Sequence, residues 1–272
     1  MAPALISRRR SSRSDSSSTS SGVAVWKLVV AYDGSEWSGW QRQANAASLQ
    51  AAIEDALTTL FGGERVILHA SGRTDAGVHA YAQVASFRTD VVRDPDKMRL
   101  GLNTMLPKSI AVIDLTIAAD NFHARFTRHQ KTYRYVILDR RDRSPFLERR
   151  AFHVRPPFDW AAVEAALPAV VGTHDFTTFR GAGCNAQSPV RTVLRAQHIA
   201  HGEEHWIEFE GAGFLRYQIR RMVGTLLEIG RGRRPWTSMA AVLAARDKAA
   251  SGRTAPPDGL FLVRVDYLEG ET

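Results

Sequence analysis

The order in which apolar segments alternate along the chain restricts its fold more than any other feature. Alternating or continuous apolar runs predict strands, and apolar residues three or four apart predict helices. The first half is predicted to contain a strand over 24–31, a helix over 49–60, strands over 65–69 and 83–87, a helix over 96–105 and a strand over 110–115. The predicted order is therefore β-α-β-β-α-β.

The second half repeats this order without obvious sequence similarity. It is predicted to contain a strand over 132–138, a helix over 160–171, a hairpin of 193–199 and 205–209, a long helix whose apolar side includes Tyr217 and Met222, a helical piece over 239–246 and a strand over 260–267. We therefore predict an α+β fold of two RRM-like or ferredoxin-like halves. These would join into one extended, mainly antiparallel sheet with helices on one face.

Three regions are expected along the chain. Residues 1–22 are rich in Ser and Arg and lack apolar periodicity, which predicts a disordered tail. An organelle transit peptide is the alternative, although no amphipathic helix is evident. Residues 23–127 and 128–272 are then expected to form an N-terminal and a C-terminal α/β subdomain.

Composition limits the classes of partner and of site. The chain has 272 residues and a net charge of +8, of which residues 1–22 contribute +3. This excess favours a polyanionic partner such as nucleic acid. A single cysteine, Cys184, excludes an intramolecular disulfide. The sequence has no apolar run of the roughly 18 residues that a membrane span needs, so a soluble protein is expected.

The segment from Gly72 to His79 concentrates chemical groups in one turn. It lies between two predicted strands, which places Asp75 at the tip of a loop. An ordinary polar turn, with Gly77 supplying a positive φ, is the alternative for this segment alone.

Arg73 lies two residues from Asp75. Arg216 and Arg220 are four residues apart and are predicted to share one face of the long helix. Because that helix is not polar all round, at least one of them is expected to point inward at a partner, and Arg220 is the candidate partner of Asp75. A neighbouring guanidinium lowers the pKa of a carboxyl and orients it.

Basic and aromatic residues alternate along the strand that contains Tyr133. Tyr133 and Tyr135 are predicted on one face and Arg134 on the other. Aromatic rings beside cations suit base stacking and phosphate contact, whereas a half-buried strand with core tyrosines is the alternative. Trp37, Trp40 and Arg42 form a further basic and aromatic group. The alternative to RNA contact is that the two tryptophans pack under the turn, and for Trp40 this alternative is favoured.

We find no Gly-rich nucleotide loop, metal-binding spacing or nucleophile elbow in the sequence. Any catalysis is therefore expected to use neither a metal nor a bound cofactor.

Beyond residue 22 the chain resembles the bacterial TruA-type tRNA pseudouridine synthases. The matching blocks occur in order. They are Tyr32-Asp33-Gly34 with Gly39-Trp40-Gln41, Gly72 to His79, Leu102-Asn103 with Leu106-Pro107, Phe122 to Arg125, Lys131 with Tyr133 and Tyr135, His174 to Phe176, Phe214 with Arg220 and Gly224, and Ala255 to Pro257 with Gly259-Leu260. The block from Gly72 to His79 is the most specific of them.

The resemblance implies an isomerase that converts uridine to pseudouridine in the anticodon stem-loop of tRNA, at positions 38, 39 and 40. Asp75 matches the essential aspartate, which acts either at C1′ as a nucleophile or at C2′ as a base. Tyr133 matches the tyrosine that stacks on the flipped uracil and is proposed to remove the C5 proton. Arg220 matches the arginine paired with the aspartate, and Arg73 the arginine that opens and holds the target nucleotide. The resemblance also implies a cytoplasmic homodimer that needs no cofactor, with tRNA lying across both subunits.

Two rival functions remain open on the sequence. One is an RNA-binding module without chemistry, which does not explain Asp75 at the tip of the loop. The other is a hydrolase of N-glycosidic bonds. Retaining enzymes of that kind generally use two carboxyl groups, and the loop offers one.

Overall fold

The computed structural model describes residues 23–268. The predicted tail over 1–22 lies outside the described residues. The first half contains β1 (Ala24–Tyr32), α1 (Leu49–Leu60), β2 (His69–Ala70), β3 (His79–Thr89), α2 (Pro95–Met105) and β4 (Ile110–Ile117).

The second half contains more strands than the sequence predicts. Its elements are β5 (His129–Asp139), β6 (Phe152–Val154), α3 (Trp160–Ala166), β7 (Gly172–Asp175), β8 (Val190–His201), β9 (Glu204–Gly211), α4 (Gln218–Gly230), α5 (Ser238–Ala244) and β10 (Leu260–Tyr267). The short strands β6 and β7 were not predicted, because three or four residues carry too little periodicity.

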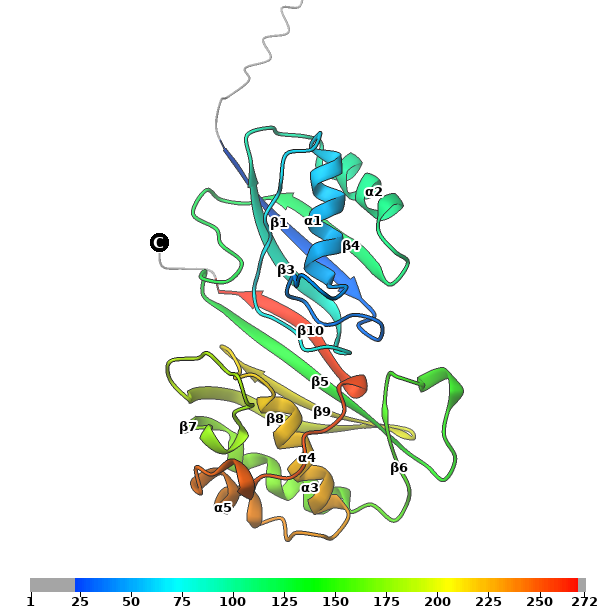
Figure 1. Ribbon diagram of the computed structural model, residues 1–272. Helices are drawn as coiled ribbons and strands as arrows, with labels where there is room; N and C mark the ends of the chain where they lie inside the picture. The colour runs from blue at the N-terminus through cyan, green and yellow to red at the C-terminus, as the bar shows by residue number, and fades with distance from the viewer. Residues whose placement is uncertain (1–22, 269–272) are drawn as a thin grey trace, which may run out of the picture.

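One sheet runs the length of the molecule in the order β4-β1-β3-β10-β5-β9-β8-β7, with β2 beside β3 and β6 beside β5. Among the strands of residues 23–268, only the pairs β10–β3 and β5–β6 are parallel. The predicted α+β fold with a mainly antiparallel sheet is thus confirmed. The last strand, β10, lies between β3 and β5 and joins the two halves (Figure 1).

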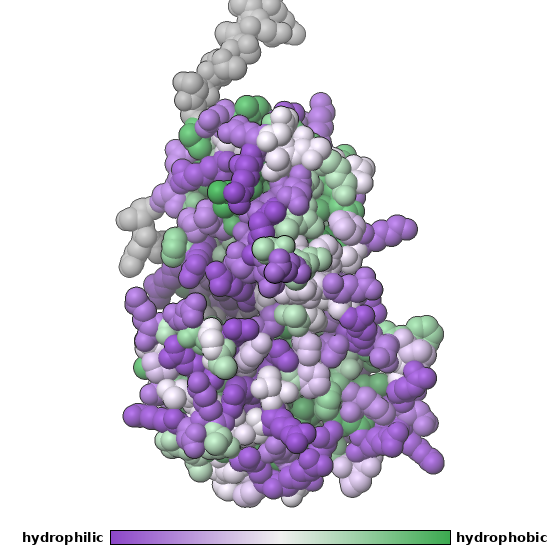
Figure 2. All heavy atoms as spheres, in the orientation of Figure 1, coloured by the Kyte–Doolittle hydropathy of each residue, from purple (hydrophilic) through white to green (hydrophobic). Residues whose placement is uncertain are grey.

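The apolar core lies on the helix-covered face of the sheet. Trp26, Leu28 and Val30 alternate along β1 and share one core with Ile53 and Leu57 of α1. In Figure 1, α1 and α4 both lie in front of the strands of their own half. Hydrophilic residues cover most of the outer surface in the same view (Figure 2).

Two predicted boundaries are wrong for local reasons. The predicted strand over 65–69 shrinks to β2 because side chains of α1 satisfy its backbone instead of a neighbouring strand. The Leu68 N–H donates to Glu54 Oε1 at 2.9 Å and the Val66 N–H to Thr58 Oγ1 at 3.3 Å. The predicted helix over 160–171 ends at Ala166, and a 3₁₀ turn that contains Pro168 follows it.

Within residues 23–268, no helix is both long enough and apolar enough to cross a membrane.

Candidate active site

The loop that carries Asp75 lies immediately before β3, at the end of that strand that pairs with β10. One side of the loop is fixed by the end of β1 and by residues that follow it. The Trp40 N–H donates to the Thr74 carbonyl at 3.1 Å, and the Tyr32 and Thr74 hydroxyls are 2.8 Å apart. Gly39 has φ +95°, and a Cβ there would lie 2.9 Å from the Thr74 carbonyl oxygen. Glycine at this position therefore lets the two loops pack backbone to backbone.

The other side of the loop is fixed from β3 and β5. Lys131 donates from Nζ to the Ser71 carbonyl at 2.6 Å, and Gln83 donates from Nε2 to the Gly72 carbonyl at 2.9 Å. Burial, with a smaller contribution from the nearby charge of Arg125, lowers the pKa of Lys131 to about 8. A rigid frame therefore carries the tip of the loop.

Arg220 projects from α4 toward Asp75, as the sequence predicts. Its Nη1 lies 3.4 Å from Asp75 Oδ2, and the two side chains are only 14% and 24% exposed. The Arg220 Nε donates to the Ala255 carbonyl at 2.8 Å, and the Ala255 N–H donates back to the Arg220 carbonyl at 3.0 Å. The segment before β10 thus orients the guanidinium.

The net effect of this environment is to raise the pKa of Asp75 above that of an ordinary aspartate. Burial is the largest cause and disfavours the charged carboxylate. The charge and hydrogen bond of Arg220, together with the charge of Arg216, lower the pKa and offset part of this effect. The sequence indicates only that a neighbouring arginine lowers the pKa of Asp75, and in the structure the rise caused by burial is larger.

Tyr133 lies in the core next to this pair. The residue is 8% exposed, and its ring meets that of Phe214 edge-on, with the ring centroids 5.6 Å apart. Burial raises the pKa of Tyr133 well above its usual value, and the charge of Asp75 raises it further. Among the described residues, no side chain or backbone group hydrogen-bonds to the Tyr133 hydroxyl. The raised pKa keeps the phenol neutral, and its hydroxyl has no hydrogen-bond partner within residues 23–268.

The remaining predicted residues are placed differently. Arg73 is exposed and makes no ion pair within residues 23–268. Arg216 precedes α4 and so does not share a helix face with Arg220, which corrects the sequence argument. Trp40 is buried in the core and Arg42 pairs with Glu54 and Asp55 of α1, so that group is structural.

Sequence reasoning missed the role of Tyr217, which it placed on the apolar side of a helix. Tyr217 lies just before α4 with φ +63°, in the left-handed region that bulky residues rarely adopt. Its ring lies 5.0 Å from the Arg220 guanidinium and 4.9 Å from that of Arg216. A Cβ at Gly181 would lie 2.6 Å from the Tyr217 ring. Tyr217 therefore packs against the guanidinium of Arg220 in a strained conformation. Nothing in a single sequence indicates this position of Tyr217.

His79, the last residue of the most specific block, points away from Asp75. Its Nδ1 accepts from the Gly34 N–H at 3.1 Å, so its Nε2–H donates to the Asp258 carbonyl at 3.1 Å. Its ring stacks on Phe261 of β10, with centroids 4.6 Å apart. Burial lowers the pKa of His79 and keeps the imidazole neutral. This residue fixes the loop to β10 and has no direct part in the site.

Within residues 23–268, no group of three or more His, Cys, Asp or Glu side chains is arranged to hold a metal ion.

A model of a protein family described as tRNA pseudouridine synthase matches residues 28–127 and 166–268. A tRNA pseudouridine synthase A of Streptococcus equi subsp. equi is 43% identical over 246 residues, which cover 90% of this chain and 99% of the relative. The enzymes of the same name from Streptococcus thermophilus and Streptococcus mutans are each 41% identical, over 89% of this chain and 98% of the relative. The chain belongs to the tRNA pseudouridine synthase family. The expectation of a TruA-type isomerase is therefore confirmed.

Burial and the charge of Arg220 shift the pKa of Asp75 in opposite directions, so removal of the charge should shift that pKa in a known direction. In the Arg220→Gln variant the pKa of Asp75 should rise further, because burial then acts with less opposing charge. Carboxyl ¹³C chemical shifts followed by NMR across a pH titration would measure it. Arg42→Gln, which breaks pairs with Glu54 and Asp55 only, should leave the value unchanged. A wild-type pKa below that of an ordinary aspartate would contradict the account.

The strain at Tyr217 predicts an ordering of two variants that both remove the ring. Tyr217→Asn should be more stable than Tyr217→Ala by about 1 kcal/mol, because asparagine tolerates the left-handed conformation better. Urea unfolding would measure the difference in free energy of unfolding. Equal stability of the two variants would show that this residue carries no strain.

Proposed function

We propose that this synthase converts uridine to pseudouridine in the anticodon stem-loop of tRNA, at positions 38, 39 and 40. The observation that carries the proposal is a partly buried carboxylate, Asp75, paired with Arg220 and lying beside the neutral phenol of Tyr133. A carboxylate at a ribose and a ring for a detached base are the parts that this isomerisation needs. The names of the family and of its relatives support tRNA as the substrate.

Asp75 acts at the ribose. In one route its carboxylate attacks C1′ as the N1–C1′ bond breaks, and in the other it takes a proton from C2′. In both, the freed uracil turns and C5 bonds to C1′. In the first route this displaces the Asp75 carboxylate from C1′, and in the second Asp75 returns the proton to C2′. The proton on C5 is then lost and N1 gains one, so the product is an isomer of the substrate. Only Oδ2 of Asp75 faces Arg220, and this leaves Oδ1 for the substrate.

Tyr133 stacks on the flipped uracil as a neutral phenol. Its raised pKa disfavours proton removal by a free tyrosinate. The charge of Asp75 is one cause of that raised pKa. Tyr133 therefore takes the C5 proton only after C5 has bonded to C1′, when loss of that proton restores the conjugated uracil ring, and the uracil stays enclosed against the Phe214 ring meanwhile.

Arg73 contacts the RNA when the target nucleotide leaves the stack. Extrusion of a base costs a few kcal/mol of lost stacking and pairing, which contacts to the displaced nucleotide offset. The exposed guanidinium, two residues from Asp75, is placed for a phosphate.

Resemblance to the family supports the remaining parts of the proposal. The synthase works in the cytoplasm as a homodimer without a cofactor, and tRNA lies across both subunits. Residues 23–127 and 128–272 serve as its two subdomains.

A purified-protein assay would test this function. With unmodified tRNA carrying uridines at positions 38 to 40, we expect pseudouridine at these positions and an intact RNA chain. Replacing the three uridines by cytidines should lower product by at least about 100-fold, since no target remains. Free uracil and abasic sites would identify a hydrolase instead. Binding without any change to the RNA would identify a module without chemistry.

A further inference from the structure

The loop between β4 and β5 presents an aromatic side chain that the proposed chemistry does not use. Phe126 is 75% exposed. Exposure of a large ring has a solvation cost, and isolated cases need no explanation. This ring, however, ends a series of three, which makes it different from an isolated exposed residue.

The three rings belong to His69, His123 and Phe126. The centroids of His69 and His123 are 4.9 Å apart, and those of His123 and Phe126 are 4.5 Å apart. The Arg125 guanidinium lies 5.6 Å from the centre of the Phe126 ring. We call these four residues the aromatic platform.

Hydrogen bonds fix the loop that carries the aromatic platform. The Ala124 N–H donates to Ser86 Oγ at 3.0 Å, and the Ala124 carbonyl accepts from the Tyr267 hydroxyl at 2.7 Å. The His123 N–H donates to Thr127 Oγ1 at 3.0 Å. The backbone that carries the exposed ring is therefore held in one place, so little backbone ordering remains to be met on binding.

The surroundings of the aromatic platform are cationic. A cavity of about 270 Å³ beside it is lined by Arg65, His69, Arg88 and His123, and no carboxylate lines it. Burial is the largest cause that lowers the pKa of His123, and the neighbouring His69, Arg125 and Arg88 also lower it. The imidazole is therefore neutral at physiological pH and offers a stacking surface, while the arginines supply the charge.

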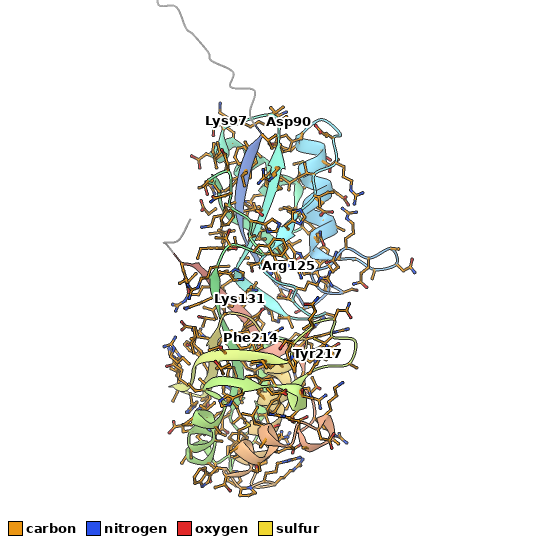
Figure 3. All side chains as sticks on the ribbon, turned by 90° about the vertical axis from the view of Figure 1, so that its left-hand side faces the viewer. Asp90, Lys97, Arg125, Lys131, Phe214 and Tyr217 are labelled. Atoms are coloured by element: carbon orange, nitrogen blue, oxygen red, sulfur yellow. The ribbon has the colours of Figure 1, made fainter. Side chains whose placement is uncertain are left out.

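The aromatic platform connects to the Asp75 site through Lys131. The Lys131 ammonium donates to the carbonyl of Ser71, at the start of the Asp75 loop, and is close enough to Arg125 for that charge to affect it. Figure 3 shows Tyr217, Phe214, Lys131 and Arg125 following one another up the same side of the molecule. Lys131 itself is buried and Arg125 is exposed, so RNA engaged at Asp75 would meet Arg125 rather than Lys131 on this side.

We propose that the aromatic platform is a second RNA subsite, which stacks an unpaired nucleobase on Phe126 and holds its phosphate with Arg125. The inference rests on the proposed function for the identity of the RNA. A ring with one arginine beside it, next to a cavity lined by two further arginines and no carboxylate, fits a nucleotide better than a protein surface.

Substitution of Phe126 tests the subsite. Phe126→Ala should raise the KM for tRNA and the Kd for tRNA by about 5- to 100-fold, the usual effect of losing one base stack, with kcat within about twofold. Phe126→Trp should keep both constants within about threefold. Phe146→Ala, which removes an 87% exposed ring elsewhere, is the matched control and should change neither constant.

A photoreactive benzophenone side chain at position 126 should crosslink to tRNA. A crosslink to a second copy of the protein, or an unchanged Kd in Phe126→Ala, would overturn the subsite. If the wild type forms no pseudouridine while Phe126→Ala still weakens tRNA binding, the proposed reaction fails and the subsite stands.

Discussion

The site depends on one docking contact, in which the segment just before β10 lies between α4 and the Asp75 loop. Ala255 exchanges two hydrogen bonds with Arg220. Pro257 lies against Gly77, whose φ of +78° and close approach leave no room for a Cβ. Asp75 and Arg220 are 145 residues apart in the chain. The segment that contains Ala255 and Pro257, near the C-terminal end of the chain, contacts both sides and so holds the two residues together. The central position of β10 in the sheet follows from the same contact, because β10 begins directly after it.

The electrostatics of the pair follow from this packing. Docking removes water from Asp75, which raises the pKa of its carboxyl, and also brings Arg220 to 3.4 Å, which opposes the rise. A carboxylate in this state is less stabilised by solvent than one on an open surface, yet has a fixed cation to compensate. Tyr133 is affected in the same direction, since it shares the dry environment and lies near the same charge. The structure thus places a partly buried carboxylate and a neutral ring close together.

Local periodicity predicted the long elements and the face on which Tyr133 lies, because burial repeats along strands and helices in a regular way. It also predicted that Arg220 faces Asp75, on the ground that an arginine in an apolar helix needs a partner. It could not predict the left-handed conformation of Tyr217 or the pairing of β10 with β3, which depend on contacts between distant segments. The pKa of Asp75 was misjudged for a related reason. A neighbouring charge is visible in a sequence, whereas the depth of burial is not.

The most direct test of the account is release of the hydrogen at C5 of uridine, with tRNA carrying tritium at that position. The wild type should release tritium as pseudouridine forms. Asp75→Asn should slow release by at least about 1,000-fold, as expected when a group that acts on the reacting atoms is removed. Its affinity for tRNA should stay within about threefold, because Asp75 contributes no positive charge to the RNA contact. Tritium release by Asp75→Asn at the wild-type rate would contradict the central claim.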